Sequence, residues 1–188
     1  MKKVLALALA AVMTTAFLAS CGTGDDSGSS GGKDSAKSSK VYLITMDQMD
    51  QHWVNVDKGC KKAVEELKAQ GTNITYKWSA PDKKEDAKQI ESVNNAVADG
   101  ADVILVAANG PDAITDSLKA AAAAGVKIIY VDSAANYEGI QTLATDNKAA
   151  GKTAGEQMIN ALKEKNVTSG KIGIVTVNAA TASTVARV

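Results

Sequence analysis

Two apolar runs decide the fold class: Ala-Asp-Val-Ile-Leu-Val-Ala at residues 101–107 and Val-Lys-Ile-Ile-Tyr-Val at residues 126–131. Their length and their content of β-branched residues are typical of strands. The first run is apolar apart from Asp102, and such nearly continuous runs are typical of strands covered on both faces. Strands of that kind belong to parallel sheets, so the sequence predicts a buried parallel sheet.

The segments around these runs alternate between strand and helix patterns. Further strands are expected at residues 41–46, 74–78, 140–144 and 171–177. Helices are expected over residues 56–67, from Pro81 and Asp82 to before Gly100, from Pro111 to Gly125, over residues 148–165, and from about Thr181. In the first helix, Val56, Cys60, Ala63, Val64 and Leu67 share one face. Alternation at this spacing indicates βαβ units, hence an α/β fold with a doubly wound parallel sheet.

The N-terminus has the organisation of a bacterial lipoprotein precursor. Two lysines precede the apolar residues 4–17, which are too few for a membrane span of about 20 residues. The sequence Leu-Ala-Ser-Cys at residues 18–21 is similar to a lipobox, which predicts a signal peptide at residues 1–20 and a lipid on Cys21. Residues 21–40 are mostly Gly, Ser, Asp and Lys and are expected to form a flexible tether.

Composition and motifs exclude several functions. The 188 residues include 21 basic and 21 acidic side chains, and this balance gives no support to nucleic-acid binding. One His and two Cys are too few for a His- or Cys-based metal cluster or a disulfide framework. No G-x-G-x-x-G follows the first strand, which excludes the dinucleotide-binding fingerprint there. Gly151-Lys152-Thr153 resembles the end of a phosphate-binding P-loop, but Asp146 stands where that motif requires its first Gly. We therefore expect no cofactor.

Polar residues gather where the predicted strands end. Residues 47–53 follow the first strand, Asn109 the third, Asp132 and Ser133 the fourth, and Asn178 the strand at residues 171–177. Ligands of open parallel sheets bind beyond these carboxyl ends. Carboxylates and amides bind hydroxyl groups, and a Trp face suits the C–H side of a sugar ring.

Each of these residues also has a purely structural interpretation. Asp132 and Asn109 could cap loops or helices, and Asp47 and Asp50 could be solvated turn residues. Trp53 could be an anchor of the hydrophobic core.

Several segments resemble the sugar-binding lipoproteins of bacterial ABC importers, the ribose- and galactose-type periplasmic binding proteins. These segments are residues 41–67, 101–107, 126–132 and 144–147, together with Gly151. The resemblance implies the type I fold, in which two α/β lobes joined by a three-stranded hinge close on a monosaccharide. For this chain it implies a first lobe over residues 41–145 and the start of a second lobe over residues 146–188. It also implies that much of the second lobe is absent, so that the chain resembles a truncated product. Ile172, Ile174, Val175 and Val177 are then expected to be incompletely buried.

The resemblance also assigns residues. Trp53 matches the ring-stacking aromatic, Asp50 and His52 adjoining polar contacts, and Asp132 the residue that binds sugar hydroxyls. Thr145, Asp146 and Asn147 match the first crossing between lobes, and Asn178 to Arg187 the second-lobe part of the site. Ser133 stands where ribose-binding members have an Arg, so the resemblance does not imply ribose.

The expected function is that of a non-enzymatic, monomeric solute-binding lipoprotein at the outer face of the bacterial membrane. It would capture a monosaccharide or similar polyol and deliver it to a membrane permease. One alternative is a sensing subunit that presents sugar to a membrane receptor or kinase. Another is a surface hydrolase that uses Asp50 or Asp132 with His52.

Overall fold

A computed structural model describes residues 38–188 of the chain. The predicted signal peptide, the lipidation site Cys21 and all but the last three residues of the predicted tether lie outside this range. They stay predictions.

The described residues form one five-stranded parallel sheet with the strand order β2-β1-β3-β4-β5. Its strands are β1 (Ser39–Ile44), β2 (Ile74–Ser79), β3 (Val103–Val106), β4 (Lys127–Val131) and β5 (Gln141–Leu143). The first strand begins two residues earlier than expected, because Ser39 and Lys40 pair with Ile74 and Thr75 of β2.

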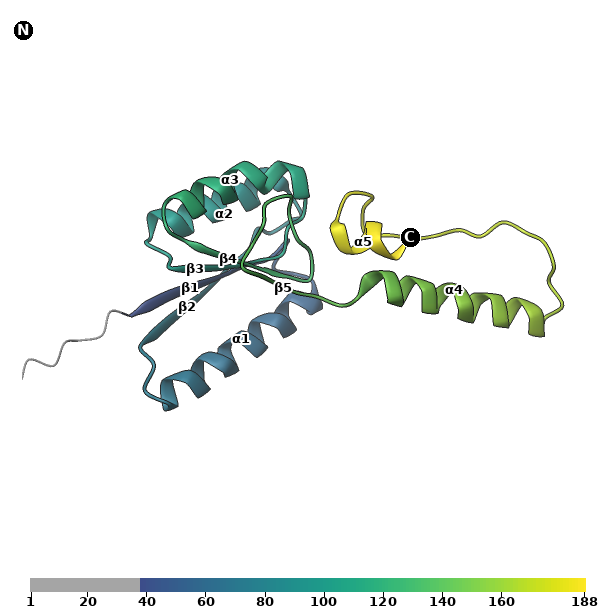
Figure 1. The fold of residues 1–188 in the computed structure, drawn as a ribbon, viewed down its shortest axis with the longest axis horizontal. Coiled ribbons are helices and arrows are strands. Elements are labelled where there is room, and N and C mark those ends of the chain that lie inside the picture. The colour runs from purple at the N-terminus through teal and green to yellow at the C-terminus, as the bar shows by residue number, and fades with distance from the viewer. Residues whose placement is uncertain (1–37) are drawn as a thin grey trace, which may run out of the picture. The chain divides into compact units, whose positions relative to one another are not determined.

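Helices cover both faces of the sheet, as Figure 1 shows. The helices in the described range are α1 (Gln51–Ala69), α2 (Asp86–Ala98), α3 (Pro111–Ala123), α4 (Asn147–Glu164) and α5 (Ala182–Arg187). The first helix lies on one side of the sheet, whereas α2 and α3 lie together on the other. The predicted α/β fold with a doubly wound parallel sheet is confirmed, including five strands and three helices within residues 41–145.

The main core lies between the sheet and the pair α2 and α3. It includes Ile44, Ile104 and Val106 from the strands, with Val93 from α2 and Leu118 from α3. On the opposite face β3 and β4 are only half covered: Val103, Leu105 and Ile129 are partly exposed. The expectation that residues 101–107 are covered on both faces was therefore wrong in part. The reason is that α1 packs mainly on β2, at one side of that face.

Two expected helices differ in detail. The second does not begin at Pro81 and Asp82 but at Asp86, and residues 80–85 form a loop after β2. In α1 the expected apolar face is half-buried at Val56, Cys60 and Val64, while Leu67 is exposed near the helix end.

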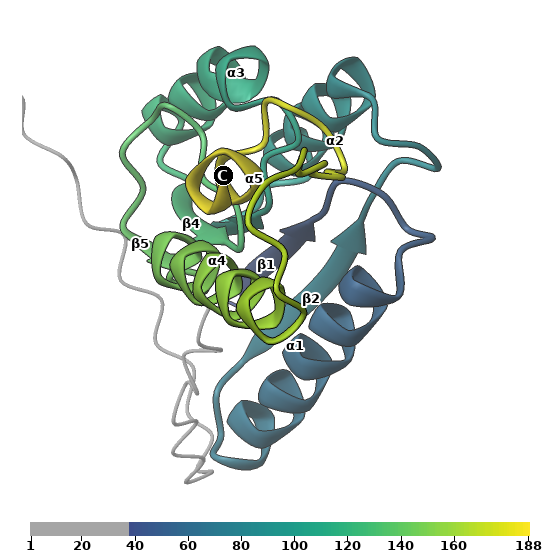
Figure 2. The ribbon, with the colours of Figure 1, turned by 90° about the vertical axis from the view of Figure 1, so that its right-hand side faces the viewer.

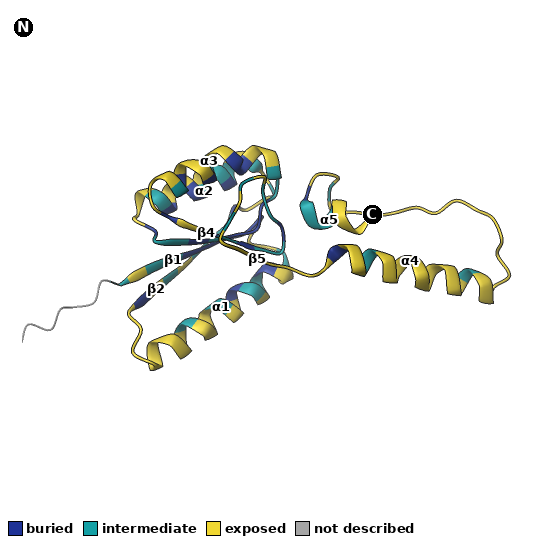
Figure 3. Ribbon diagram, viewed as in Figure 1, coloured by how far each residue is buried: buried dark blue, intermediate teal, exposed yellow. Residues whose placement is uncertain are grey.

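Residues 171–177 contain no strand, which corrects the expectation for this segment. A strand needs a neighbour to satisfy its backbone groups, and no described strand pairs with these residues. The four apolar side chains are exposed, Val175 to 99%, as expected from the sequence. Figure 3 shows this exposure continuing along α4.

Candidate functional site: a polar cleft at the carboxyl edge of the sheet

The chain reverses direction across the sheet at β1, because β2 lies on one side of it and β3 on the other. Such a switch point opens a crevice beyond the carboxyl ends of the strands. Buried Gln89 of α2 holds this crevice together: its amide nitrogen donates to the carbonyl oxygens of Thr45 (3.1 Å) and Ala107 (2.8 Å). Its amide oxygen accepts from the backbone N–H of Asn109 at 3.0 Å. One side chain therefore fixes the loops that follow β1 and β3.

A cleft of about 360 Å³ lies at this edge. One wall comes from the loops of the sheet and the start of α1, and the other from residues 175–187, including α5. Figure 2 shows α5 in front of the sheet. The lining residues are Met46, Asp50, His52, Trp53, Lys84, Asp132, Val175, Thr176, Val177, Thr181, Ser183, Thr184 and Arg187. Of the eight ligand-binding residues predicted from the sequence, Asp50, His52, Trp53, Asp132 and Arg187 are thus brought together.

Asp50 is the N-cap of α1. Its Oδ1 accepts from the backbone N–H of His52 at 3.0 Å, and its Oδ2 lies 3.3 Å from the ammonium of Lys84. The hydrogen bond from His52 and the nearby Lys84 hold the pKa of this carboxyl below its usual value, despite partial desolvation. A carboxylate in this environment is ionised and has the capacity to accept further hydrogen bonds.

Trp53 is both a core residue and part of the cleft wall. Its side chain is 3% exposed and packs with Met46 and Ala107, while its ring meets that of His52 edge to face. The indole N–H has no hydrogen-bond partner among the described residues. A fixed aromatic ring at a cleft wall offers an apolar surface next to the carboxylate of Asp50.

Asp132 follows β4 with a positive φ of 65°, which is uncommon for a residue with a side chain. Such backbone conformations concentrate at binding and catalytic sites. Its Oδ2 accepts from the hydroxyl of Ser133 at 2.8 Å. Ser133 is buried outside the cleft lining, and its hydroxyl also lies 2.9 Å from that of Ser183 on α5. It therefore links Asp132 to the opposite wall.

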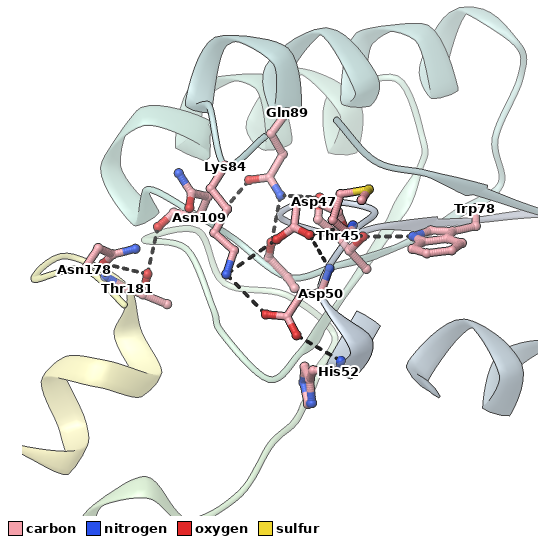
Figure 4. Close-up of polar contacts among 12 residues, drawn as sticks. Thr45, Asp47, Asp50, His52, Trp78, Lys84, Gln89, Asn109, Asn178 and Thr181 are labelled. Atoms are coloured by element: carbon pink, nitrogen blue, oxygen red, sulfur yellow. Dashed lines mark hydrogen bonds and ion pairs between the residues drawn. The ribbon is translucent and has the colours of Figure 1, made fainter. Parts of the chain in front are cut away.

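Asn109 and Asn178, predicted as ligand contacts, also lie outside the lining. The Asn109 amide donates to Asp86 at the start of α2. The side-chain oxygen of Asn178 accepts from the backbone N–H of Thr181 at 2.7 Å and so shapes the turn before α5 (Figure 4). The Thr181 hydroxyl lies 3.2 Å from the carbonyl oxygen of Asn109 and joins the two walls.

The three predicted hinge residues connect β5 to α4. Asp146 is the N-cap of α4 and accepts from the backbone N–H of Ala149 at 2.9 Å. The buried Asn147 donates from its amide to the carbonyl oxygen of Thr145 at 3.0 Å. These contacts define the start of α4, while the hinge role stays a prediction.

Sequence reasoning did not identify Lys84 as a residue of the cleft wall. Lys84 was overlooked because Pro81 and Asp82 were interpreted as a helix start, which hides a loop at the carboxyl end of β2. Every parallel strand ends at the same edge, so the residues after β2 were candidates by position alone. Thr181 and Ser183 lie within residues 178–187, which the resemblance assigned to the site as a range without naming either residue.

Among residues 38–188, no three His, Cys, Asp or Glu side chains are grouped so that they could hold a metal ion. Within the same range, no helix combines the length and apolar character needed to cross a membrane.

Several solved structures with similar folds are described as sugar transporters or as solute-binding proteins of ABC transporters. A sugar transporter from Clostridium phytofermentans is 28% identical with a TM-score of 0.69, over 78% of this chain and 52% of the solved one. An ABC transporter solute-binding protein from Agrobacterium vitis, with bound D-fucose, is 29% identical with a TM-score of 0.66, over 79% and 50% of the two chains. A sugar-binding protein of a sugar ABC transporter from Bacillus halodurans is 26% identical with a TM-score of 0.58, over 68% and 42%.

The chain therefore spans about half the length of these proteins. A family model described as a periplasmic binding protein domain matches residues 41–188, nearly all of the described part. The parallel sheet, the helices on both of its faces and this match agree that the chain belongs to the periplasmic binding protein family and has its type I fold.

Proposed function

We propose that this protein is a sugar-binding component of an ABC importer and captures a monosaccharide or similar polyol in the cleft at the carboxyl edge. The observation that carries the proposal is the composition of that cleft: the carboxylates of Asp50 and Asp132, the rings of His52 and Trp53, and the guanidinium of Arg187 line one space. Carboxylates accept from sugar hydroxyls, Arg donates to them, and an aromatic ring covers apolar C–H groups. The solved relative with bound D-fucose supports a sugar as ligand.

Closure completes the site in this proposal. The cleft has walls from residues 41–145 and from residues 175–187, and the hydroxyl contacts of Ser183 and Thr181 already join them. A ligand that touches both walls stabilises the closed arrangement by its differential affinity for it. Thr145, Asp146 and Asn147 are the proposed hinge.

In this proposal the site binds its ligand without cleaving it, and Asp50 is not suited to act as the general acid of a glycosidase. Glycosidases need one carboxyl group with a raised pKa as general acid. The pKa of Asp50 is instead lowered by the backbone N–H of His52 and by Lys84. Asp50 is thus ionised at neutral pH and cannot donate the proton that the leaving group needs.

The partner and location follow from this role. The closed protein docks on a membrane permease outside the cytoplasm, as a monomer anchored by a lipid on Cys21. Support for the anchor comes from the sequence Leu-Ala-Ser-Cys at residues 18–21.

A thermal-shift screen of the full-length protein tests the proposal. The panel contains D-fucose, D-galactose, D-ribose, L-arabinose, L-rhamnose and D-tagatose, with sodium chloride as the control. At least one sugar is expected to raise the melting temperature in a saturable way, and chromatography of the mixture should recover that sugar unchanged. No shift with any sugar, or recovery of a cleaved or altered product, would overturn the proposal.

A further inference from the structure

Lys84 occupies an unusual position for a loop lysine. Its ammonium lies between two carboxylates, 3.5 Å from Oδ2 of Asp47 and 3.3 Å from Oδ2 of Asp50, as Figure 4 shows. The side chain is 30% exposed and forms part of the cleft wall. It comes from the loop that follows β2, whereas both acids come from the loop that follows β1.

Both carboxylates are themselves fixed. Asp47 is 5% exposed, and its Oδ1 accepts from the backbone N–H groups of Met49 and Asp50 at 2.8 and 2.7 Å. Its Oδ2 accepts no hydrogen bond and faces only the Lys84 ammonium among the described cations. A buried carboxylate requires a partner charge, which holds Lys84 in place. Asp50 is fixed from the other side by its bond to the N–H of His52.

This arrangement leaves hydrogen-bonding capacity directed to the cleft. An ammonium has three N–H donors. One of them donates to Oδ2 of Asp50, whereas Oδ2 of Asp47 is paired with the Lys84 ammonium by charge alone. Asp50 retains acceptor lone pairs, because each carboxylate oxygen accepts more than one hydrogen bond. Lys84 and Asp50 therefore offer a donor and an acceptor side by side, and a single hydroxyl group, which both accepts and donates, satisfies the two together.

The charges limit the class of ligand. Asp47, Asp50 and Asp132 carry three negative charges at or directly behind the cleft wall, against the two positive charges of Lys84 and Arg187. This excess of one negative charge disfavours an anionic ligand such as a sugar acid.

From these contacts we propose that Lys84 is a specificity-determining contact, which with Asp50 recognises one particular hydroxyl group of an uncharged sugar. The inference rests on the proposed sugar-binding function. A ligand that lacks this hydroxyl leaves one desolvated N–H of Lys84 and one lone pair of Asp50 without a hydrogen bond, which costs more than the loss of a neutral hydrogen bond. Binding is expected to fall about 10- to 100-fold for such an analogue.

The test combines protein variants with ligand analogues. The ligand is the sugar of the panel above that binds most tightly, together with its monodeoxy analogues and its uronic acid. Calorimetry gives dissociation constants for the full-length protein, for Lys84→Gln and for the matched control Lys83→Gln, which changes an exposed neighbour outside the cleft lining.

The expected result is specific to one hydroxyl. The protein and Lys83→Gln should both reject one monodeoxy analogue by about 10- to 100-fold, and Lys84→Gln should bind the parent sugar and that analogue about equally. The uronic acid should bind more weakly than the parent sugar throughout. Lys84→Arg keeps a cation for the two acids if Lys84→Gln proves unstable, and it should alter the same discrimination.

Three results overturn parts of the account. A folded Lys84 variant that still rejects the same monodeoxy analogue as the unmodified protein would contradict the proposed contact but not the sugar-binding function. A lysine with only a structural role would weaken the binding of every ligand equally. Tighter binding of the uronic acid than of the parent sugar would contradict the charge argument. Absence of binding by the unmodified protein to every sugar would refute the proposed function, and this inference with it.

Discussion

Replacement of Gln89 by Met should lower both the free energy of unfolding and the affinity of the site for sugar. The two side chains have similar length, so Met fills the same space beneath the cleft but removes three hydrogen bonds to backbone groups of Thr45, Ala107 and Asn109. Each such bond contributes about 1 kcal/mol. Of the residues whose backbone groups are left behind, Thr45 and Ala107 are buried and Asn109 is half-buried. We therefore expect the free energy of unfolding to fall by about 3 kcal/mol, a large fraction of the roughly 5–15 kcal/mol typical of domains.

Urea unfolding followed by circular dichroism measures this loss. The matched control is Asn94→Met, which replaces an exposed amide on the same helix and should change stability by less than about 0.5 kcal/mol. Sugar affinity of Gln89→Met should also fall, because the loops after β1 and β3 are no longer fixed. A loss below about 1 kcal/mol for Gln89→Met would refute the view that this amide holds the crevice together.

Three further predictions concern other parts of the chain. Cys21→Ser should prevent lipidation, and the protein should leave the membrane fraction; unchanged fractionation and unchanged mature mass would contradict the lipobox interpretation. Gly151→Ala places a Cβ 2.1 Å from the carbonyl oxygen of Arg187. It should therefore displace α5 and lower sugar affinity, with little change in the melting of the sheet, and equal affinity in calorimetry would show that α5 does not depend on this close contact. Hydrogen bonds from Lys77, Tyr42 and Lys40 hold the pKa of Asp99 well below 3.8. The stabilisation by this charge should be complete above that value and disappear as the pH falls towards the lowered pKa. Asp99→Asn should accordingly be less stable than the unmodified protein at pH 6 but not in strong acid, and an equal difference at both pH values would contradict this assignment.

The parallel sheet could be predicted because its evidence is local. The apolar runs that form β3 and β4, and the Gly and Pro residues that bound α3, are readable without knowledge of any contact. The position of the site follows from the same information, since all parallel strands end at one edge. Asp50, His52, Trp53 and Asp132 are predicted as ligand contacts in this way, and all four line the cleft.

Features that depend on contacts between distant segments could not be predicted. Residues 171–177 have the composition of a strand, but a strand forms only where a neighbour accepts its hydrogen bonds. Ser133 stays a predicted ligand contact, but its hydroxyl lies 2.9 Å from that of Ser183, a residue 50 positions further along the chain, and no local pattern reveals that contact. The role of Lys84 likewise depends on two acids that are 34 and 37 residues away, which no sequence spacing reveals.

The most direct test of the central claim is calorimetry on Asp132→Ala with the sugar that binds best. Asp132 lines the cleft in a left-handed backbone conformation, and one carboxylate oxygen has no donor among the described residues. Loss of a charged hydrogen bond to a sugar hydroxyl should cost about 1.5–3 kcal/mol, a reduction of about 10- to 100-fold in affinity. Asp116→Ala, which removes an exposed carboxylate on α3, is the control and should leave the affinity unchanged. Equal affinities for Asp132→Ala and Asp116→Ala would contradict the assignment of this cleft as the sugar site.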